Sequence, residues 1–398
     1  MDDSRFEVDP QGDTILVLRC PKTAQPVWEP ENESAKRRRG NDIPMTKLFL
    51  DSQFDSGMDV DPSDDEDTHG PTPGTIAVTV AESSLPNDSG EAHGENIKRE
   101  DVKFRLSSRH LALASPVFRT MLNGSWKESA SSSGWSGNGC PVRYELTAAE
   151  WDDEILLLLM NIIHGRNSLV PLSVDLTTLM KMSVVVDYYQ CQEVTLFVVG
   201  LWIKELSGSL PKEYGRDCVA WMFVSWVFSC SELFEKMTSL AMEGSEGGLG
   251  KIYLPLPPTL LSTLTPHLSG LHAFSKLIDF AAVMEQRRRQ FIDDIFTTLE
   301  AVSMQLRQGS LGCSFGCASM LLGSVIKGTD DHKLHRDCSP ARARFIALSL
   351  RVRTKTPDNS RTCCTLHEVL TTSVQKMWQT LEGLKLQDYK GQERKPAN

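Results

Sequence analysis

The stretch that most constrains the fold of this chain is SSRHLALASPVFRTML, at residues 107–122. An alternating run, VKFRL, comes directly before it and predicts a half-buried strand. Ser107 or Ser108 is suited to cap a helix. Ser115 ends that helix, because the residue before Pro116 disfavours helical geometry, and proline suits the first turn of the next helix. The stretch therefore predicts two short helices joined at a Ser-Pro corner.

Apolar residues of these two helices are expected to form a core, while the polar residues cap, turn or face outward. The expected core residues are Leu111, Ala114, Val117, Phe118, Met121 and Leu122. A Ser/His/Asp site is not expected, because His110 shares one helix start with two serines and has no evident orienting acid. The chain also lacks a G-x-S-x-G elbow and a phosphate loop that follows a strand. We therefore predict a protein that is not an enzyme, with no catalytic residue, no cofactor and no small-molecule substrate.

The rest of the chain predicts a few strands and many helices. Strands are expected at residues 12–20 and 142–146. The apolar run TAAEWDDEILLLLMNIIHG predicts a buried helix that Thr147 caps and Gly165 stops. CVAWMFVSWVF, at residues 218–228, is too short to span a bilayer and is expected to be a buried helix. We expect no transmembrane segment.

A long polar segment separates the first two predicted strands. It covers roughly residues 21–100 and holds few large apolar residues, so we expect it to be disordered. The net charge of −10 is concentrated there, because residues 51–70 carry eight acids and no lysine or arginine. Such an acidic balance argues against a nucleic-acid partner. A basic cluster in the same segment resembles a nuclear localisation signal. Its residues are Lys36, Arg37, Arg38 and Arg39.

The ten cysteines are scattered, and the start of the chain does not resemble a secretory signal. We therefore expect a reducing intracellular compartment and thiols rather than disulfides. One stretch combines cysteine with histidine, but its C-x3-C and H-x2-H spacings differ from those of zinc fingers. Its members are Cys313, Cys317, His332, His335 and Cys338. The alternative is that the cysteines are buried on a core helix and the histidines are exposed, and the sequence leaves metal binding open.

A long helical pattern runs from about residue 265 to 307. The basic run at residues 287–289 is expected to be a solvated face. Apolar residues then follow at alternating three- and four-residue spacing over two repeats, which favours packing within the chain over a coiled-coil dimer. They are Ile292, Ile295, Leu299, Val302 and Leu306.

The segment FRLSSRHLALASPVFRTMLNGSWKES resembles the signature of BTB/POZ domains, in which a strand leads into a helix ending in Ser-Pro-Val-Phe and then a second helix. GDTILVL is similar to the first strand of that family, and VDLTTLMKMSVVVDYYQCQEV is similar to one of its later helices. The residue pattern of this later part resembles the fungal branch of the family. The resemblance implies an α+β fold with a small sheet flanked by helices. The implied parts are a first strand at 8–20, a disordered acidic insertion at 21–100, the remainder of the domain at 101–206, a helical extension at 207–310 and a mixed C-terminal region with a polar tail at 311–398.

The resemblance implies a non-catalytic protein that self-associates, as a homodimer, or recruits protein partners. A subset of the family holds substrates on cullin ubiquitin ligases, through an apolar-x-Glu motif after the second helix. Trp126, Lys127 and Glu128 stand at the matching place and are candidate cullin contacts. The alternatives are therefore a cullin adaptor and a nuclear regulator of transcription or chromatin, in the cytoplasm, the nucleus or both. The insertion replaces the tight turn usual in the family, which puts dimerisation in question, although loop closure costs rise only logarithmically with length.

Overall fold

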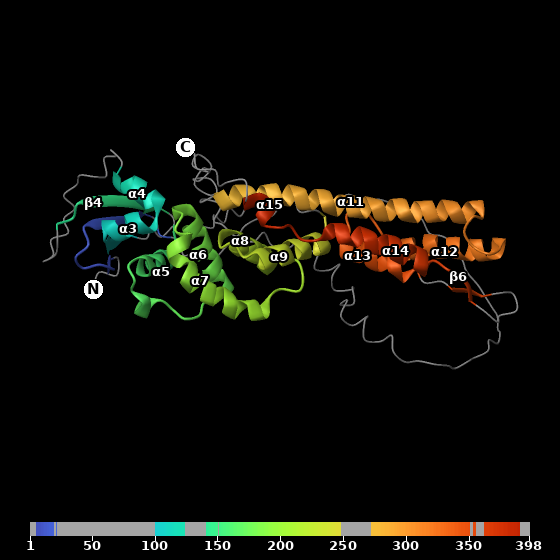
Figure 1. Cartoon of the computed structure of the whole chain (residues 1–398), viewed down its shortest axis with the longest axis horizontal. Helices are drawn as coiled ribbons and strands as arrows, with labels where there is room; N and C mark the ends of the chain where they lie inside the picture. Colours follow the sequence, from blue (N-terminus) through green and yellow to red (C-terminus); the bar gives the residue numbers. More distant parts are fainter. Residues whose placement is uncertain are drawn as a thin grey trace, which may run out of the picture. The chain divides into compact units, whose positions relative to one another are not determined.

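The computed structural model describes residues 5–19, 21, 100–123, 141–149, 151–247, 272–350, 353–355 and 362–390. Within these ranges the chain combines a small β-sheet with a larger number of helices, which is compatible with the predicted α+β class (Figure 1). None of the described helices combines the length and the apolar character that crossing a bilayer requires.

The N-terminal half contains a four-stranded sheet, whose strands lie in the order β1-β3-β2-β4. Its strands are β1 (Arg5–Glu7), β2 (Thr14–Arg19), β3 (Val102–Leu106) and β4 (Tyr144–Ala149). β2 pairs antiparallel with β3 and parallel with β4, so that Leu16 lies opposite Phe104 on one side and Leu146 on the other. All three side chains are buried. The first two predicted strands are confirmed, whereas the third is shifted toward the C-terminus.

β2 and β3 are neighbours in the sheet although β2 ends at Arg19 and β3 begins at Val102. The buried Arg105 side chain donates from Nε to the carbonyl of Gly12 at 3.0 Å. By its contacts the chain divides into Glu29–Lys98 and the remainder, and all described residues belong to the remainder. The strands on either side of the insertion are therefore built into one sheet, while the domain boundaries proposed above stay predictions.

The helices of the N-terminal half occur in the predicted order, with β4 between α4 and α5. They are α3 (Ser108–Ala114), α4 (Pro116–Asn123), α5 (Asp153–Ile163), α6 (Leu176–Tyr189) and α7 (Gln192–Leu206). The two short helices joined at Ser115 are confirmed. The expected cap Thr147 is wrong, because the alternating run YELTAA continues β4 through it. Asp152 caps α5 instead, and its carboxylate accepts from the N–H groups of Glu154 and Ile155.

The C-terminal half is mostly helical. It comprises α8 (Arg216–Val227), α9 (Ser231–Gly244), α11 (His272–Gln308), α12 (Phe315–Asp331), α13 (Pro340–Ser349), α14 (His367–Trp378) and α15 (Gln387–Lys390), with a hairpin of β5 (Arg353–Lys355) and β6 (Thr362–Thr365). Every residue of α8 from Cys218 onward is buried, which confirms the predicted buried helix.

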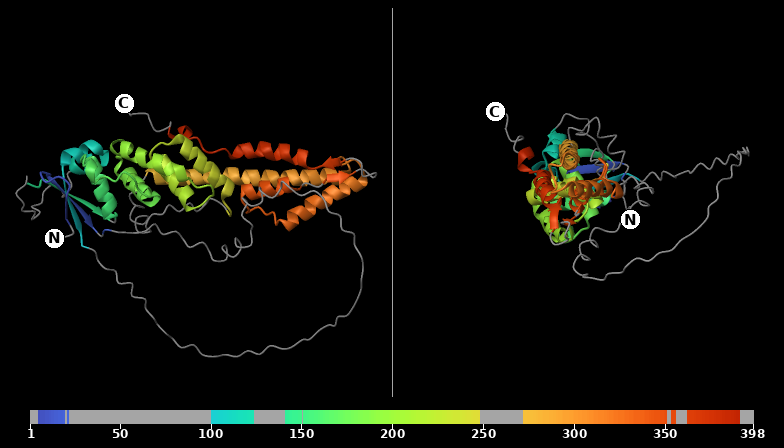
Figure 2. Two further views of the ribbon diagram at one scale, coloured as in Figure 1. Left: turned by 90° about the horizontal axis from the view of Figure 1, so that it is seen from below. Right: turned by 90° about the vertical axis from the view of Figure 1, so that its right-hand side faces the viewer.

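α11 contacts α12, α13 and α14, and in the left view of Figure 2 it runs between α14 and α12. The apolar residues spaced at three and four along α11 are all buried within the chain, and they are Ile292, Ile295, Leu299, Val302 and Leu306. The expected packing of these residues within the chain is therefore confirmed.

Candidate functional site

The Ser-Pro corner between α3 and α4 is fastened to the end of α6. The Ser115 hydroxyl donates to the carbonyl of Tyr189 at 2.5 Å and accepts from the N–H of Phe118 at 3.0 Å. The Phe118 ring stacks on the Tyr189 ring, with centroids 4.3 Å apart. Ser115 is fully buried, so it serves packing rather than nucleophilic chemistry.

The six predicted core residues all pack in one apolar cluster. Leu111, Phe118 and Leu122 are buried, and the other three are half-buried against the same core; these are Ala114, Val117 and Met121. The polar residues His110 and Arg119 are exposed, as expected.

Ser107 is the N-cap residue of α3, as expected, but its side chain makes no capping hydrogen bond, and distant side chains bind the first N–H groups instead. The Asp13 carboxylate accepts from both the N–H and the hydroxyl of Ser108, each at 2.8 Å. Nε2 of His164 accepts from the N–H of Ser107 at 3.0 Å. The Ser108 hydroxyl is used as a donor, and the first turn of α3 is tied both to the start of β2 and to the end of α5.

Both capping groups have pKa values below their ordinary range. Burial acts to raise the pKa of Asp13, but the hydrogen bonds from Ser108 and Thr14 favour the carboxylate, and the net direction is down. Burial lowers the pKa of His164, and the neighbouring His110 and Arg166 lower it further. Because Nε2 accepts from Ser107, the ring is neutral with its proton on Nδ1, which donates to the carbonyl of Met160 at 2.8 Å.

Two sets of predicted site residues lie outside the described ranges. The first is the candidate cullin contact, Trp126, Lys127 and Glu128, which follows the end of α4. The second is the candidate nuclear localisation signal, Lys36, Arg37, Arg38 and Arg39. Both remain predictions from the sequence.

α7 presents large apolar side chains to solvent. Leu196 is 54% exposed, Phe197 78% and Leu201 46%. The opposite face of the same helix is anchored by the buried Trp202, whose Nε1 donates to the carbonyl of Pro171 at 2.9 Å. Sequence reasoning missed this face, although EVTLFVVGLWIKEL places apolar residues around the whole helix. Soluble monomers rarely expose contiguous apolar patches without a partner.

The structure separates the five candidate metal ligands. Cys313 and Cys317 lie at the start of α12, where Cys313 precedes the helix rather than sharing it. His332 caps the opposite end of the same 17-residue helix, followed by His335 and Cys338. Since each helical residue adds about 1.5 Å, the two groups lie at opposite ends of α12, and a single site from all five residues is wrong.

A different cysteine joins the first pair. The Sγ atoms of Cys313, Cys317 and Cys364 all lie within 4.8 Å of one another. Cys364 belongs to β6, which contacts α12. Sequence reasoning missed Cys364, and the only local signal was the adjacent cysteine pair in TCCT.

The redox states within this cluster differ. Cys313 is disulfide-bonded, whereas Cys317 and Cys364 carry thiols. The expectation that all cysteines are thiols is therefore wrong for Cys313. Burial raises the pKa of Cys364, the neighbouring Cys317 raises it further, and a backbone hydrogen bond at Cys313 lowers it.

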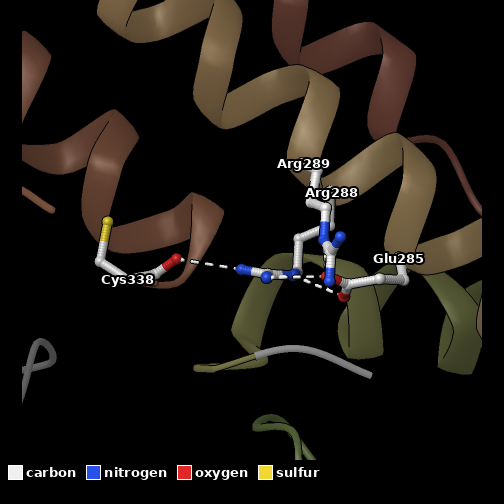
Figure 3. A network of polar contacts seen from close by, with 4 residues as sticks. All are labelled: Glu285, Arg288, Arg289 and Cys338. Carbon is white, nitrogen blue, oxygen red and sulfur yellow. Dashed lines mark hydrogen bonds and ion pairs between the residues drawn. The ribbon is translucent and has the colours of Figure 1, made fainter. Parts of the chain in front are cut away.

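The basic run of α11 is not simply a solvated face, because Arg288 is only 3% exposed. Its guanidinium binds both carboxylate oxygens of Glu285, at 2.9 and 3.0 Å, and reaches the carbonyl of Cys338 at 3.3 Å (Figure 3). Arg289 also binds Glu285, from the exposed side. The network ties α11 to the turn that precedes α13.

A pocket of about 320 Å³ opens beside this network. Arg288, Arg289 and Arg336 line it together with Asp293 and Asp337. The cations already have partners within the chain, since Arg288 and Arg289 bind Glu285 and Arg336 binds Asp293. We therefore interpret the pocket as part of a structural ion-pair network rather than an anion-binding site.

Comparison with known proteins found no matching family model, no similar curated protein and no similar solved structure.

Proposed function

We propose that this chain is a non-catalytic protein-interaction protein of BTB/POZ type that acts inside the cell by self-association or by recruiting a protein partner. The proposal rests on the resemblance of residues 104–129 to the signature of that family and on the order of elements around them. After β1, which precedes the residues that carry the resemblance, two strands, two short helices, a strand, a helix and a helical pair follow one another in the order that the resemblance implies.

The exposed face of α7 is the observation that most favours a partner. Leu196, Phe197 and Leu201 form an apolar face on a helix whose other side is firmly packed. Covering such a face removes apolar surface from water at about 25 cal/mol per Å². We therefore place a protein contact there and define these three residues as the α7 face.

The substitution Phe197→Glu tests this contact. Because Phe197 is 78% exposed, the change should alter the free energy of unfolding by about 0.5 kcal/mol or less. It should nevertheless weaken association by about tenfold or more, because a charge on a buried contact face is costly. Size-exclusion chromatography with light scattering measures self-association, and affinity purification with quantitative mass spectrometry measures retained partners.

Met320→Glu is the matched control, because Met320 is also more than half exposed but lies on α12. It should leave association unchanged. A strictly monomeric wild-type protein without a reproducible partner would argue against the proposal as a whole. Equal effects of Phe197→Glu and Met320→Glu on association would instead show that the α7 face is not the contact site.

A cullin ligase component is a second candidate partner. The sequence Trp126-Lys127-Glu128 comes shortly after α4, where adaptors of this family carry their apolar-x-Glu motif. Glu128→Ala should then reduce cullin co-purification while leaving self-association intact. Absence of cullin from the wild-type purification would end this candidate without affecting the first.

A further inference from the structure

A group of three cysteines lies at one end of the C-terminal helices, remote in sequence from the proposed interaction domain. The Sγ atoms of Cys313, Cys317 and Cys364 lie within 4.8 Å of one another. Cys317 is buried, Cys364 is half-buried and Cys313 is exposed. The cluster is therefore packed against the protein at Cys317 and open to solvent at Cys313.

The turn between α11 and α12 places the first two cysteines. Gly312 has a φ of +101°, and a Cβ there would lie 3.1 Å from the backbone nitrogen of Ala318, so the turn is pressed against α12. Ser314 caps α12 by accepting from the N–H of Cys317 at 3.2 Å. Cys317 thus lies in the first turn of a 17-residue helix, where the helix dipole favours negative charge such as a thiolate.

The spacing of the three sulfur atoms suits a tetrahedral metal ion. Zinc–thiolate bonds of about 2.3 Å place sulfur ligands about 3.8 Å apart in a tetrahedron. The observed sulfur–sulfur separations of up to 4.8 Å need only a small adjustment to reach that value. The ligand atoms that this group offers are all cysteine sulfurs. Thiolate ligands favour zinc and other soft cations over calcium or magnesium.

We propose that Cys313, Cys317 and Cys364 form a zinc site when Cys313 is reduced, and that the disulfide between Cys313 and a cysteine outside this group keeps the site free of metal. A dithiol reductant supplies two electrons and two protons, the disulfide at Cys313 becomes two thiols, and the reductant becomes a disulfide. Zinc then displaces the protons of the thiols of Cys313, Cys317 and Cys364 and forms three Zn–S bonds, which leaves one coordination position for a fourth ligand, either the thiol released from Cys313 by reduction or solvent. Binding joins α12 to β6 across about 50 residues of chain.

Cobalt(II) titration of the full chain tests the site. The protein is reduced, freed of reductant under anaerobic conditions and titrated with cobalt(II), which reports thiolate ligation by its near-ultraviolet charge-transfer band. We expect about one tetrahedral cobalt ion per chain, displaced by zinc. The oxidised protein should bind about tenfold more weakly or not at all, because Cys313 then provides no thiolate and only Cys317 and Cys364 remain as ligands.

Cys317→Ser and Cys364→Ser should each weaken binding at least about tenfold. Cys338→Ser and His335→Ala, at the opposite end of α12, serve as controls and should bind as the wild type does. Circular dichroism checks that each variant is folded, and the half-buried Cys364 provides the test if substitution of the buried Cys317 prevents folding.

Three results would overturn the proposal. The first is a folded, reduced wild-type protein that takes up no cobalt. The second is equal uptake by the oxidised protein, and the third is loss of binding in the Cys338 or His335 variants. The proposed zinc site is independent of the proposed interaction function, so evidence against the zinc site would not count against the interaction function.

Discussion

At the scale of single residues, the start of α3 depends on two side chains that are remote in sequence. The first four backbone N–H groups of any α-helix have no hydrogen-bond acceptor within the helix itself. Asp13 and His164 supply the missing acceptors for Ser108 and Ser107. Removing either acceptor leaves a part-buried donor unsatisfied, which makes both residues specific tests of how the sheet and helices are joined.

Asp13→Ala should lower the free energy of unfolding by about 1–2 kcal/mol, the usual cost of losing a cap. The carboxylate accepts two hydrogen bonds from Ser108, and alanine accepts none. Urea denaturation followed by circular dichroism measures the change. Glu193→Ala, an exposed acid of α7, is the control and should cost little. Equal effects of the two substitutions would show that the cap contributes nothing.

His164 should make the fold less stable in mild acid. Its folded-state pKa is lowered below the ordinary 6.5, so the unfolded chain takes up a proton at a higher pH than the folded chain. The stabilisation is complete above 6.5 and is lost as the pH falls through the lowered folded value. Protonation also removes the acceptor for the Ser107 N–H.

Unfolding free energies at pH about 7.5 and about 5.5 measure this dependence, because the interval spans the titration of histidine. His164→Gln stays neutral and should show a smaller loss of stability over that interval. His332→Gln, at an exposed position, should behave as the wild type. An identical pH dependence in all three proteins would rule out His164 as the responsible group.

At the scale of elements, the end of β3 approaches the turn before β2 so closely that only glycine fits. A Cβ on Gly12 would lie 2.3 Å from the carbonyl oxygen of Leu106, which is backbone and cannot move aside easily. Gly12→Ala should therefore lower the free energy of unfolding by about 3 kcal/mol or more.

Gly200→Ala is the matched control for Gly12→Ala. Gly200 lies on the exposed side of α7 with no atom near its missing Cβ. Alanine there should be neutral or should stabilise the helix by up to about 1 kcal/mol. Thermal unfolding of both variants measures the contrast, and similar midpoints would contradict the close approach at Gly12.

Element identity was largely predictable from local pattern. The alternation of VKFRL and the Ser-Pro corner after it depend on neighbouring residues, and both are confirmed. The ends of the elements were less predictable, because neighbouring strand and helix patterns compete for the same residues. Thr147 has the chemistry of a cap, yet the alternation continues β4 through it, and Asp152 becomes the cap of α5.

At the scale of the whole molecule, the sheet is completed by strands on either side of Glu29–Lys98. Leu18 pairs directly with Val102, so the ends of β2 and β3 are close enough for a short linker. Replacing residues 29–98 by about ten Gly and Ser residues should stabilise the fold by about 1 kcal/mol, because loop closure costs about 0.6 kcal/mol per doubling of length.

Denaturant unfolding of the shortened chain measures that change. Marked destabilisation would show that the sheet needs the removed residues. The shortened chain also lacks Lys36 to Arg39 and the acidic stretch at 51–70, so fluorescent tagging of both chains tests the nuclear alternative separately.

The sequence by itself determines which segments become strands and helices, because side-chain periodicity, proline and glycine act over a few residues. It also determines the apolar core around the Ser-Pro corner. Only the tertiary structure decides which acceptors cap α3, which face of α7 stays exposed and which cysteines meet. The reason is distance along the chain: Asp13 and Ser108, or Cys317 and Cys364, become neighbours only after elements far apart in sequence have packed.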